Sequence, residues 1–264
     1  MGGEEKADKE EMINLIDYDS CVAIIPARGG SKSVPKKNIR LFKGHPLIAY
    51  SIAVAQLSQK IDRVIVSTDS EEIAEIAKGY GAEVPFMRPA EYALDDSPDI
   101  DFVKHAIQWF ADNERRIPEY IAHIRVTTPI RDFRIVDEGI MKIRQDKTAS
   151  SLRSGYICVH PPYKWLQFSD AGYMKPLMPG ITCDEANMAR QGFPKVLVPN
   201  SYVDVLKADY VIANNLIHGE RMIGFVTDEV PDIDTEEDLY KLEIYKGHKK
   251  AFLELYEYLS GYVG

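Results

Sequence analysis

Continuous apolar runs and amphipathic segments alternate along most of the chain, which is the pattern of a sheet covered by helices. A strand that is buried on both faces has no polar side, so short apolar runs predict such strands. The predicted strands span residues 21–26, 63–69, 83–86, 120–127, 201–206 and 223–226.

Apolar residues spaced three, four and seven positions apart predict helices between these strands. In the first of them Ile48, Ile52 and Ala55 share one face, and Ser70 is placed to cap the second. The predicted helices cover 46–57, the segment from Ser70 to Gly81, 99–112, the segment ending near Arg144, the segment after Thr235 and the C-terminal tail. This order predicts an α/β fold with a mostly parallel, doubly wound, Rossmann-like sheet.

The alternation breaks over residues 150–199, which are rich in proline and aromatic residues and lack a helical period. A loose surface excursion is one interpretation. Its apolar content favours an arm that packs against a second subunit, and so a homodimer. We therefore expect a single domain over 20–264 with 150–199 as a dimerisation and sugar-contacting insertion. Residues 1–19, rich in charge, are expected to form a flexible leader.

Composition narrows the functional classes. The chain has 264 residues, 45% of them hydrophobic, and a net charge of −9, which argues against general nucleic-acid binding. Its three cysteines are odd in number and widely spaced, without a Cys-x-x-Cys pair, which favours free thiols in a reducing compartment. No apolar run is long enough for a signal peptide or a membrane span. We expect a cytoplasmic protein that binds neither nucleic acid nor membrane.

A basic loop directly follows the first predicted strand. It contains the adjacent glycines Gly29 and Gly30 and the cations Arg28, Lys32, Lys36 and Lys37. Glycines permit close backbone approach, and backbone N–H groups with fixed cations form a cradle for phosphate. The alternative is a solvated basic turn. The loop matches neither the P-loop nor the G-x-G-x-x-G motif, and no G-x-S-x-G or H-E-x-x-H sequence occurs.

Two carboxylates, Asp232 and Asp234, flank Ile233 near the C-terminus. In an extended segment they would point to one side while Ile233 enters the core. Paired carboxylates suit Mg²⁺, which completes its shell with substrate phosphates. The alternative is a capping cluster for the helix that follows.

In combination these segments resemble the acylneuraminate cytidylyltransferases. The resemblance covers roughly residues 22–242 and includes the motif Ala27-Arg-Gly-Gly-Ser-Lys-Ser-Val-Pro-Lys-Lys-Asn38. Further matches follow in order at 64–69, 88–91, 127–131, 189–191, 198–200 and 232–235. The resemblance implies a nucleotidyltransferase fold and Mg²⁺-dependent transfer of CMP from CTP to the anomeric hydroxyl of an acidic nine-carbon α-keto sugar, with release of pyrophosphate.

The resemblance also implies residue roles. Arg28, Lys32 and Lys37 would hold the triphosphate, and Arg28, Lys37 and Asp234 would carry the chemistry, with a carboxylate of the Asp232–Asp234 pair assisting deprotonation of the sugar hydroxyl. The other implied nucleotide-binding residues are Gly29, Gly30, Ser31, Asn38 and Arg88. Asp99 is a further candidate, although it departs from the family pattern. The implied sugar-binding residues are Thr127, Thr128, Lys164, Arg190 and Gln191, of which Lys164 and Arg190 would act across the dimer interface. Arg125 is a further sugar-binding candidate, although it departs from the family pattern.

Departures from the family pattern leave alternatives open. Arg125 stands where the family commonly has Gln, and its guanidinium would pair with a substrate carboxylate. Asp99 stands where small hydroxyl residues are usual. Its carboxylate would accept hydrogen bonds from an amino-bearing base, guanine included. The alternative is that Asp99 caps the helix that follows. Asp204 and Ser201 replace an aromatic residue and a glycine, and no chemistry is inferred from them.

Two other functions therefore remain open. One is a same-fold enzyme that uses an octulosonate or another nucleotide such as GTP. The other is an inactive nucleotide-binding relative, which the presence of the loop cations and the aspartate pair disfavours.

Overall fold

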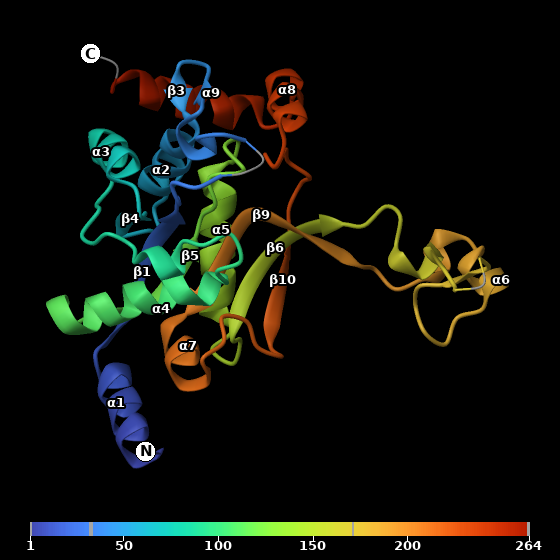
Figure 1. Ribbon diagram of the computed structural model, residues 1–264, viewed down its shortest axis with the longest axis horizontal. Coiled ribbons are helices and arrows are strands. Elements are labelled where there is room, and N and C mark those ends of the chain that lie inside the picture. Colours follow the sequence, from blue (N-terminus) through green and yellow to red (C-terminus); the bar gives the residue numbers. More distant parts are fainter. Residues whose placement is uncertain (1, 32–33, 171, 263–264) are drawn as a thin grey trace.

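A mixed six-stranded sheet forms the centre of the computed structural model, which describes residues 2–31, 34–170 and 172–262 (Figure 1). The strand order is β10-β6-β9-β5-β1-β4. All neighbours are parallel except β9, which runs antiparallel to β5 and β6. The strands are β1 (Ile16–Pro26), β4 (Arg63–Ser67), β5 (Ile117–His123), β6 (Ser151–Ile157), β9 (Leu197–Lys207) and β10 (Met222–Val226).

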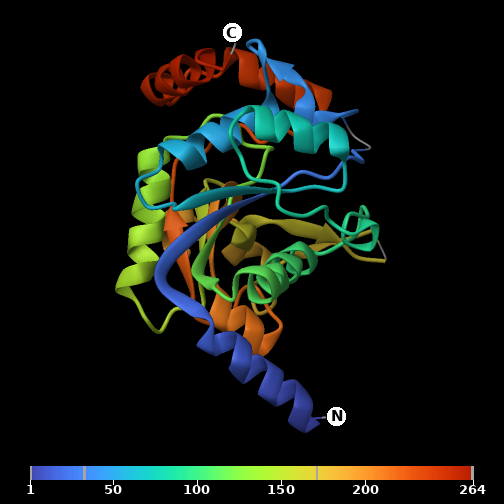
Figure 2. The same cartoon turned by 90° about the vertical axis from the view of Figure 1, so that its left-hand side faces the viewer.

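Helices cover both faces of this sheet, as the alternation predicts. On one face Ala23 and Ile25 of β1 join a core with α2, α3, α5 and α9, while Val22 and Ile24 point to α4 and α7 on the other. Figure 2 shows α5 and α4 on opposite sides of the sheet. The helices are α1 (Gly2–Asn14), α2 (Leu47–Leu57), α3 (Glu71–Gly79), α4 (Asp99–Trp109), α5 (Phe133–Gln145), α6 (Cys183–Ala186), α7 (Ala208–Asn214), α8 (Glu236–Ile244) and α9 (Lys249–Ser260).

The prediction of an α/β fold with a mostly parallel, doubly wound sheet is confirmed, but local differences are informative. Residues 83–86 contribute only an isolated bridge between Glu83 and Ile65. Strand β5 ends at His123, so Arg125 and Thr127 lie in the irregular segment beyond it. The expected flexible leader at 1–19 is wrong for its described part, because that segment forms helix α1 and the first residues of β1.

The arm is shorter than expected at both ends. Residues 151–157 form the sheet strand β6 and residues 197–207 form β9, so only the segment between them protrudes (Figure 1). That segment contains the hairpin of β7 (Leu166–Phe168) and β8 (Met174–Pro176) and the short helix α6. A second hairpin, β2 (Leu41–Phe42) with β3 (His45–Pro46), lies on the body of the molecule. Among the described residues no helix is both long and apolar enough to cross a membrane.

Candidate active site

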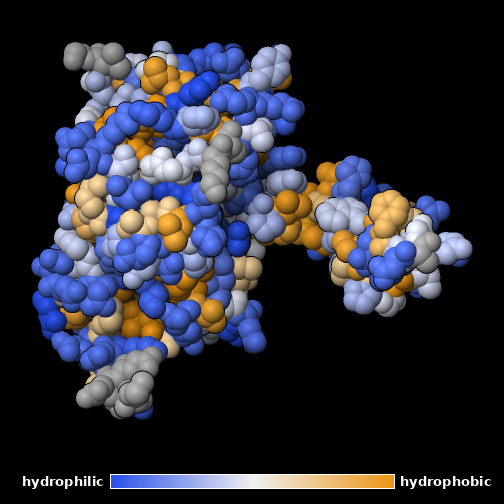
Figure 3. Space-filling view, in the orientation of Figure 1, coloured by the Kyte–Doolittle hydropathy of each residue, from blue (hydrophilic) through white to orange (hydrophobic). Residues whose placement is uncertain are grey.

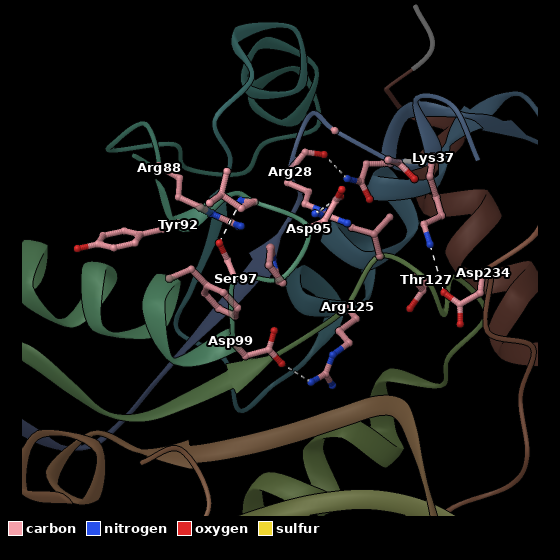
Figure 4. Close-up of a pocket in the computed structure, with 17 residues that line it drawn as sticks. Arg28, Lys37, Arg88, Tyr92, Asp95, Ser97, Asp99, Arg125, Thr127 and Asp234 are labelled. Carbon is pink, nitrogen blue, oxygen red and sulfur yellow. Dashed lines mark hydrogen bonds and ion pairs between the residues drawn. The ribbon is translucent and has the colours of Figure 1, made fainter. Parts of the chain in front are cut away.

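A cavity of about 550 Å³ opens beyond the carboxyl ends of β1 and β5, where open α/β sheets bind their ligands (Figure 4). Many of the residues predicted to bind the nucleotide, the sugar or the metal line it. These are Arg28, Gly30, Ser31, Lys37, Asn38, Arg88, Asp99, Arg125, Thr127 and Asp234. Lys32, predicted to bind the triphosphate, lies outside the described residues.

The loop after β1 is fixed by its neighbours. The Gly29 N–H donates to Asp69 Oδ1 (2.8 Å), and Asn38 Nδ2 donates to the Arg28 carbonyl (2.8 Å). A Cβ at Gly29 would lie 3.1 Å from the Ser70 Cβ, so the loop approaches the start of α3 too closely for most side chains. The glycine predicted from the basic loop therefore has a packing role as well.

Lys37 joins this loop to the carboxylate segment near the C-terminus. Its Nζ donates to the Ile233 carbonyl (2.8 Å) and lies 3.3 Å from Asp234 Oδ1. The Ile233 N–H in turn donates to the Thr127 carbonyl (2.8 Å), and the Ile233 side chain is fully buried, as predicted. Three segments distant in sequence thus converge at one corner of the cavity (Figure 4).

The predicted carboxylate pair divides between two cavities. Asp234 lines the cavity described above and is largely exposed. Asp232 lines a different one and accepts from the hydroxyls of Ser201 (2.9 Å) and Thr128 (3.4 Å). Thr128 itself is fully buried, so of the two threonines predicted to touch the sugar only Thr127 reaches the cavity.

Arg88 is buried in the cavity wall. Its Nε donates to Ser67 Oγ (3.0 Å), its Nη2 donates to the Ser67 carbonyl (2.5 Å), and its guanidinium lies 5.1 Å from the centre of the Phe102 ring. Burial lowers the pKa of Arg88 to about 10, although Asp69 and Asp99 oppose the shift. Arg28 pairs with Asp95 (2.7 Å) across the cavity.

Arg125 meets two protein carboxylates. Its Nη2 donates to Asp99 Oδ2 and its Nη1 donates to Asp204 Oδ2, both at 2.8 Å. Burial alone would lower the pKa of Arg125, but the two aspartates outweigh it and the pKa is raised. The guanidinium expected to be free for a substrate carboxylate is therefore already paired. Sequence reasoning assigned no chemistry to Asp204, and its only signal was an acidic residue inside an otherwise apolar strand.

Arg131 is a second residue that sequence reasoning missed. It is fully buried below the cavity and donates to the carbonyls of Arg125 and Ser201 and to Ser51 Oγ. Burial lowers its pKa to about 9. Arg131 thus fixes the backbone of the segment that carries Arg125.

The predicted sugar ligands of the arm do not reach the cavity of their own chain. Lys164, Arg190 and Gln191 lie on the protruding arm (Figure 1). Lys164 Nζ donates to the Met188 carbonyl and lies 5.9 Å from the centre of the Phe193 ring. The Lys164 ammonium is therefore engaged within the arm.

The sequence is similar to known cytidylyltransferases. Residues 22–145 match the family model described as cytidylyltransferase. The chain is 36% identical to an N-acylneuraminate cytidylyltransferase of Escherichia coli over 58% of this chain and 37% of that protein. It is 29% identical to a CMP-N,N'-diacetyllegionaminic acid synthase of Campylobacter jejuni over 83% of this chain and 92% of that one.

The fold has close counterparts among solved structures. One is a CMP:2-keto-3-deoxy-manno-octonic acid synthetase complexed with CTP, with a TM-score of 0.63 at 15% identity over 89% of this chain and 99% of that chain. At this identity the match concerns the fold alone. The matched family model and the names of the two enzymes above support the predicted resemblance to the acylneuraminate cytidylyltransferases.

Proposed function

We propose that this enzyme transfers CMP from CTP to the anomeric hydroxyl of an acidic nine-carbon α-keto sugar and releases pyrophosphate. The observation that carries the proposal is the convergence of Arg28, Lys37 and Asp234 on one cavity. The names of the two relatives support CTP as the donor and a nonulosonate as the acceptor.

The cavity offers residues suited to the phosphates and residues suited to the base. Arg28 and Lys37, with the backbone of Gly30 and Ser31, would hold the triphosphate. Arg88 in the cavity wall and Asn38, which donates to the Arg28 carbonyl, would hold the pyrimidine nucleoside. Arg88 suits this role because its guanidinium is fixed by Ser67 and so loses little freedom when a ligand binds.

Catalysis would rest on charge placed in advance of the reaction. Attack of the sugar hydroxyl on the α-phosphorus breaks the bond to pyrophosphate, and negative charge develops on the phosphoryl oxygens and the leaving group. Lys37 is held by Ile233 and Asp234, so its ammonium stabilises that charge without reorganising. Asp234 is the exposed carboxylate beside this site and would accept the proton of the hydroxyl.

The donor set at this corner fits Mg²⁺ only in part. Among the described residues no group of three or more histidine, cysteine or acidic side chains could hold a metal ion. Asp234 is open to the cavity, whereas both carboxylate oxygens of Asp232 already accept hydrogen bonds from the hydroxyls of Thr128 and Ser201. One carboxylate with substrate phosphates is a usual Mg²⁺ site, so we propose Asp234 as its protein ligand. Bound there, Mg²⁺ would supply Lewis-acid stabilisation of phosphoryl oxygens.

We also propose that the arm forms a homodimer. Trp165, Phe168 and Tyr173 are at least half exposed, and Figure 3 shows apolar surface continuing along the junction of arm and body. Such a surface is typical of a subunit interface. In a dimer, Lys164, Arg190 and Gln191 of the arm would be able to approach the acceptor sugar bound in a partner's cavity.

The function is tested by mixing the protein with CTP, Mg²⁺ and a panel of nonulosonates and octulosonates, with the other three nucleotides in parallel. We expect pyrophosphate and a CMP-sugar from CTP with a nonulosonate. If only octulosonates give product, the proposed acceptor is wrong. If only GTP gives product, the proposed nucleotide is wrong. No pyrophosphate from any pair would refute the proposed activity.

A further inference from the structure

An unbroken chain of charged groups runs from the cavity into the sheet. Asp99 lies at the start of α4 on the cavity wall, Arg125 lies beside it, and Asp204 lies on β9 beneath them. The two Arg125 contacts, to Asp99 and to Asp204, are each 2.8 Å. We call these three residues the Asp99–Arg125–Asp204 cluster.

Asp204 is the unusual member because its side chain is only 1% exposed. A buried carboxylate is costly unless a cation and hydrogen bonds compensate it. Arg125 supplies both, whereas the nearest other cation, Arg153, approaches the second oxygen only to 4.0 Å. Among the described residues that second oxygen, Oδ1, has no hydrogen-bond partner. Asp204 therefore depends on Arg125, and Arg125 is held in one place by Asp204.

No neighbouring histidine supplies additional positive charge. His123 is paired in register with Asp204 on the adjacent strand, and its side chain is buried against Phe102. Burial holds the pKa of His123 well below its usual range, so the imidazole is neutral near pH 7. His218 is half-buried, and this partial burial lowers its pKa as well. Within the cluster itself one cation thus lies between two anions, with Arg153 at 4.0 Å from Asp204 Oδ1.

This balance limits what can bind against the cluster. The cavity wall presents remaining guanidinium N–H donors of Arg125 next to a partly exposed carboxylate of Asp99. A hydroxyl or acylamino group both donates and accepts, and so matches this surface. A carboxylate or phosphate would meet an arginine that is already neutralised and a second anion beside it.

We propose that the Asp99–Arg125–Asp204 cluster selects acceptors that present an uncharged hydroxyl or acylamino group at this wall, with Asp204 as the positioning residue for Arg125. The proposal rests on the proposed function and specifies its acceptor. In Figure 4, Thr127 lies between the Lys37–Asp234 corner and Arg125. An acceptor that reacts at that corner would therefore extend its far end past Thr127 to the cluster.

The first test compares Asp204→Asn with wild type in steady-state kinetics, using CTP and the nonulosonate that wild type accepts. Loss of a charged hydrogen bond predicts an increase in KM for the sugar of about tenfold or more, with KM for CTP nearly unchanged. Arg63→Gln is the matched control, because Arg63 also bridges two carboxylates, Glu83 (2.6 Å) and Glu114 (2.7 Å), outside the cavity. It should leave both KM values unchanged.

The second test uses the same sugar with and without a phosphate on its terminal hydroxyl. Wild type should strongly prefer the uncharged form. Asp99→Asn leaves Arg125 less neutralised and should reduce that preference about tenfold. If Asp204→Asn does not fold, Arg125→Gln with Asp204→Asn removes both buried charges and should show the same rise in sugar KM.

The outcomes separate two failures. If wild type forms no CMP-sugar, the proposed function fails whatever the variants do. If wild type is active and Asp204→Asn leaves the sugar KM unchanged, or raises the CTP KM equally, the cluster does not position a sugar-binding arginine. An unchanged preference in Asp99→Asn refutes the selection of uncharged groups.

Discussion

The body and the arm of this protein bury apolar side chains to different extents. In the body, both faces of the sheet are covered, and side chains such as Ile24, Ile25 and Phe110 are almost completely inaccessible. In the arm, Phe168 is 80% exposed and Tyr173 is 76% exposed. The arm holds itself together by local devices instead, including a stacked pair of Tyr163 and Phe193 with ring centres 5.5 Å apart.

This contrast indicates that the body and the arm depend to different extents on a second copy of the chain. The body has a complete core and an almost complete catalytic cavity, so its stability and the chemistry should depend on residues of one chain. The arm has apolar surface without a covering partner in that chain, so its contribution should depend on a second copy. Three of the predictions below apply one kind of change to both regions, and the other two change one region only.

The largest effect is expected from truncating one phenylalanine in each region. Phe110→Ala removes a fully buried ring and should lower the free energy of unfolding by about 3–5 kcal/mol. Phe168→Ala should change it by less than about 0.5 kcal/mol in the monomer, since the ring is exposed. Chemical denaturation at low protein concentration measures both. A large loss from Phe168→Ala in a monomer would show that the arm belongs to the body's cooperative unit.

The same arm variant should weaken self-association. If Phe168 lies in the proposed interface, Phe168→Ala should shift the molecular mass measured by light scattering toward the monomer as the protein is diluted. A wild-type protein that is monomeric at assay concentration would contradict the proposed dimer.

The next effect concerns two lysines. Lys37→Ala removes the cation held at the reacting corner and should reduce kcat about 10²–10³-fold, the usual consequence of losing one preorganised charge contact. Lys175→Ala, on strand β8 of the arm, removes an equal charge far from the cavity and should leave kcat unchanged. Circular dichroism of both variants verifies the fold. Near-normal turnover by Lys37→Ala would remove Lys37 from the mechanism.

Helix caps give a smaller effect. Thr235 caps α8 in the body and Thr182 caps α6 in the arm, each in a reciprocal capping box. Thr235→Ala should lower the free energy of unfolding by about 1 kcal/mol. Thr182→Ala should increase amide hydrogen exchange in the arm and leave unfolding of the body unchanged. Equal losses of global stability would contradict the separation of the two regions.

The smallest effect depends on pH. Hydrogen bonds from Thr235 and Lys241 lower the pKa of Asp238 in the α8 cap to about 2. Because the folded value lies below the unfolded value of about 3.9, the carboxylate stabilises the fold above pH 4, and this contribution is lost as the pH falls toward 2. Denaturation of Asp238→Asn between pH 2 and 5 should show a shallower pH dependence than wild type. Identical slopes would exclude a contribution from Asp238.

Most of the fold could be predicted because buried strands and amphipathic helices leave local patterns. The prediction of a strand at 83–86 is too long, because the structure has only one bridge there. A short apolar run has the same composition whether it forms several strand pairs or a single bridge. The start of β1 at Ile16 was missed because polar residues at 17–20 interrupt its pattern. The extent of the arm was misjudged because β6 and β9 contain proline or polar residues where they leave the sheet.

The site could be predicted where its residues lie close together in sequence or in a family motif. The basic loop, Arg88, Thr127 and Asp234 all line one cavity. The separation of Asp232 from Asp234 and the pairing of Arg125 with Asp99 and Asp204 depend on tertiary placement. No local pattern distinguishes an aspartate that faces a ligand from one that neutralises a buried arginine.

The arm begins and ends at neighbouring points of the central sheet. The register pairs Ile157 at the end of β6 with Leu197 at the start of β9, so the chain leaves and re-enters the body at neighbouring points. The whole arm is therefore a hairpin loop in topological terms. Because the entropy of closing a loop rises only with the logarithm of its length, arms of other lengths can be grafted between these two residues at little cost to the body. The junction is a natural site for building chimeras with exchanged arms.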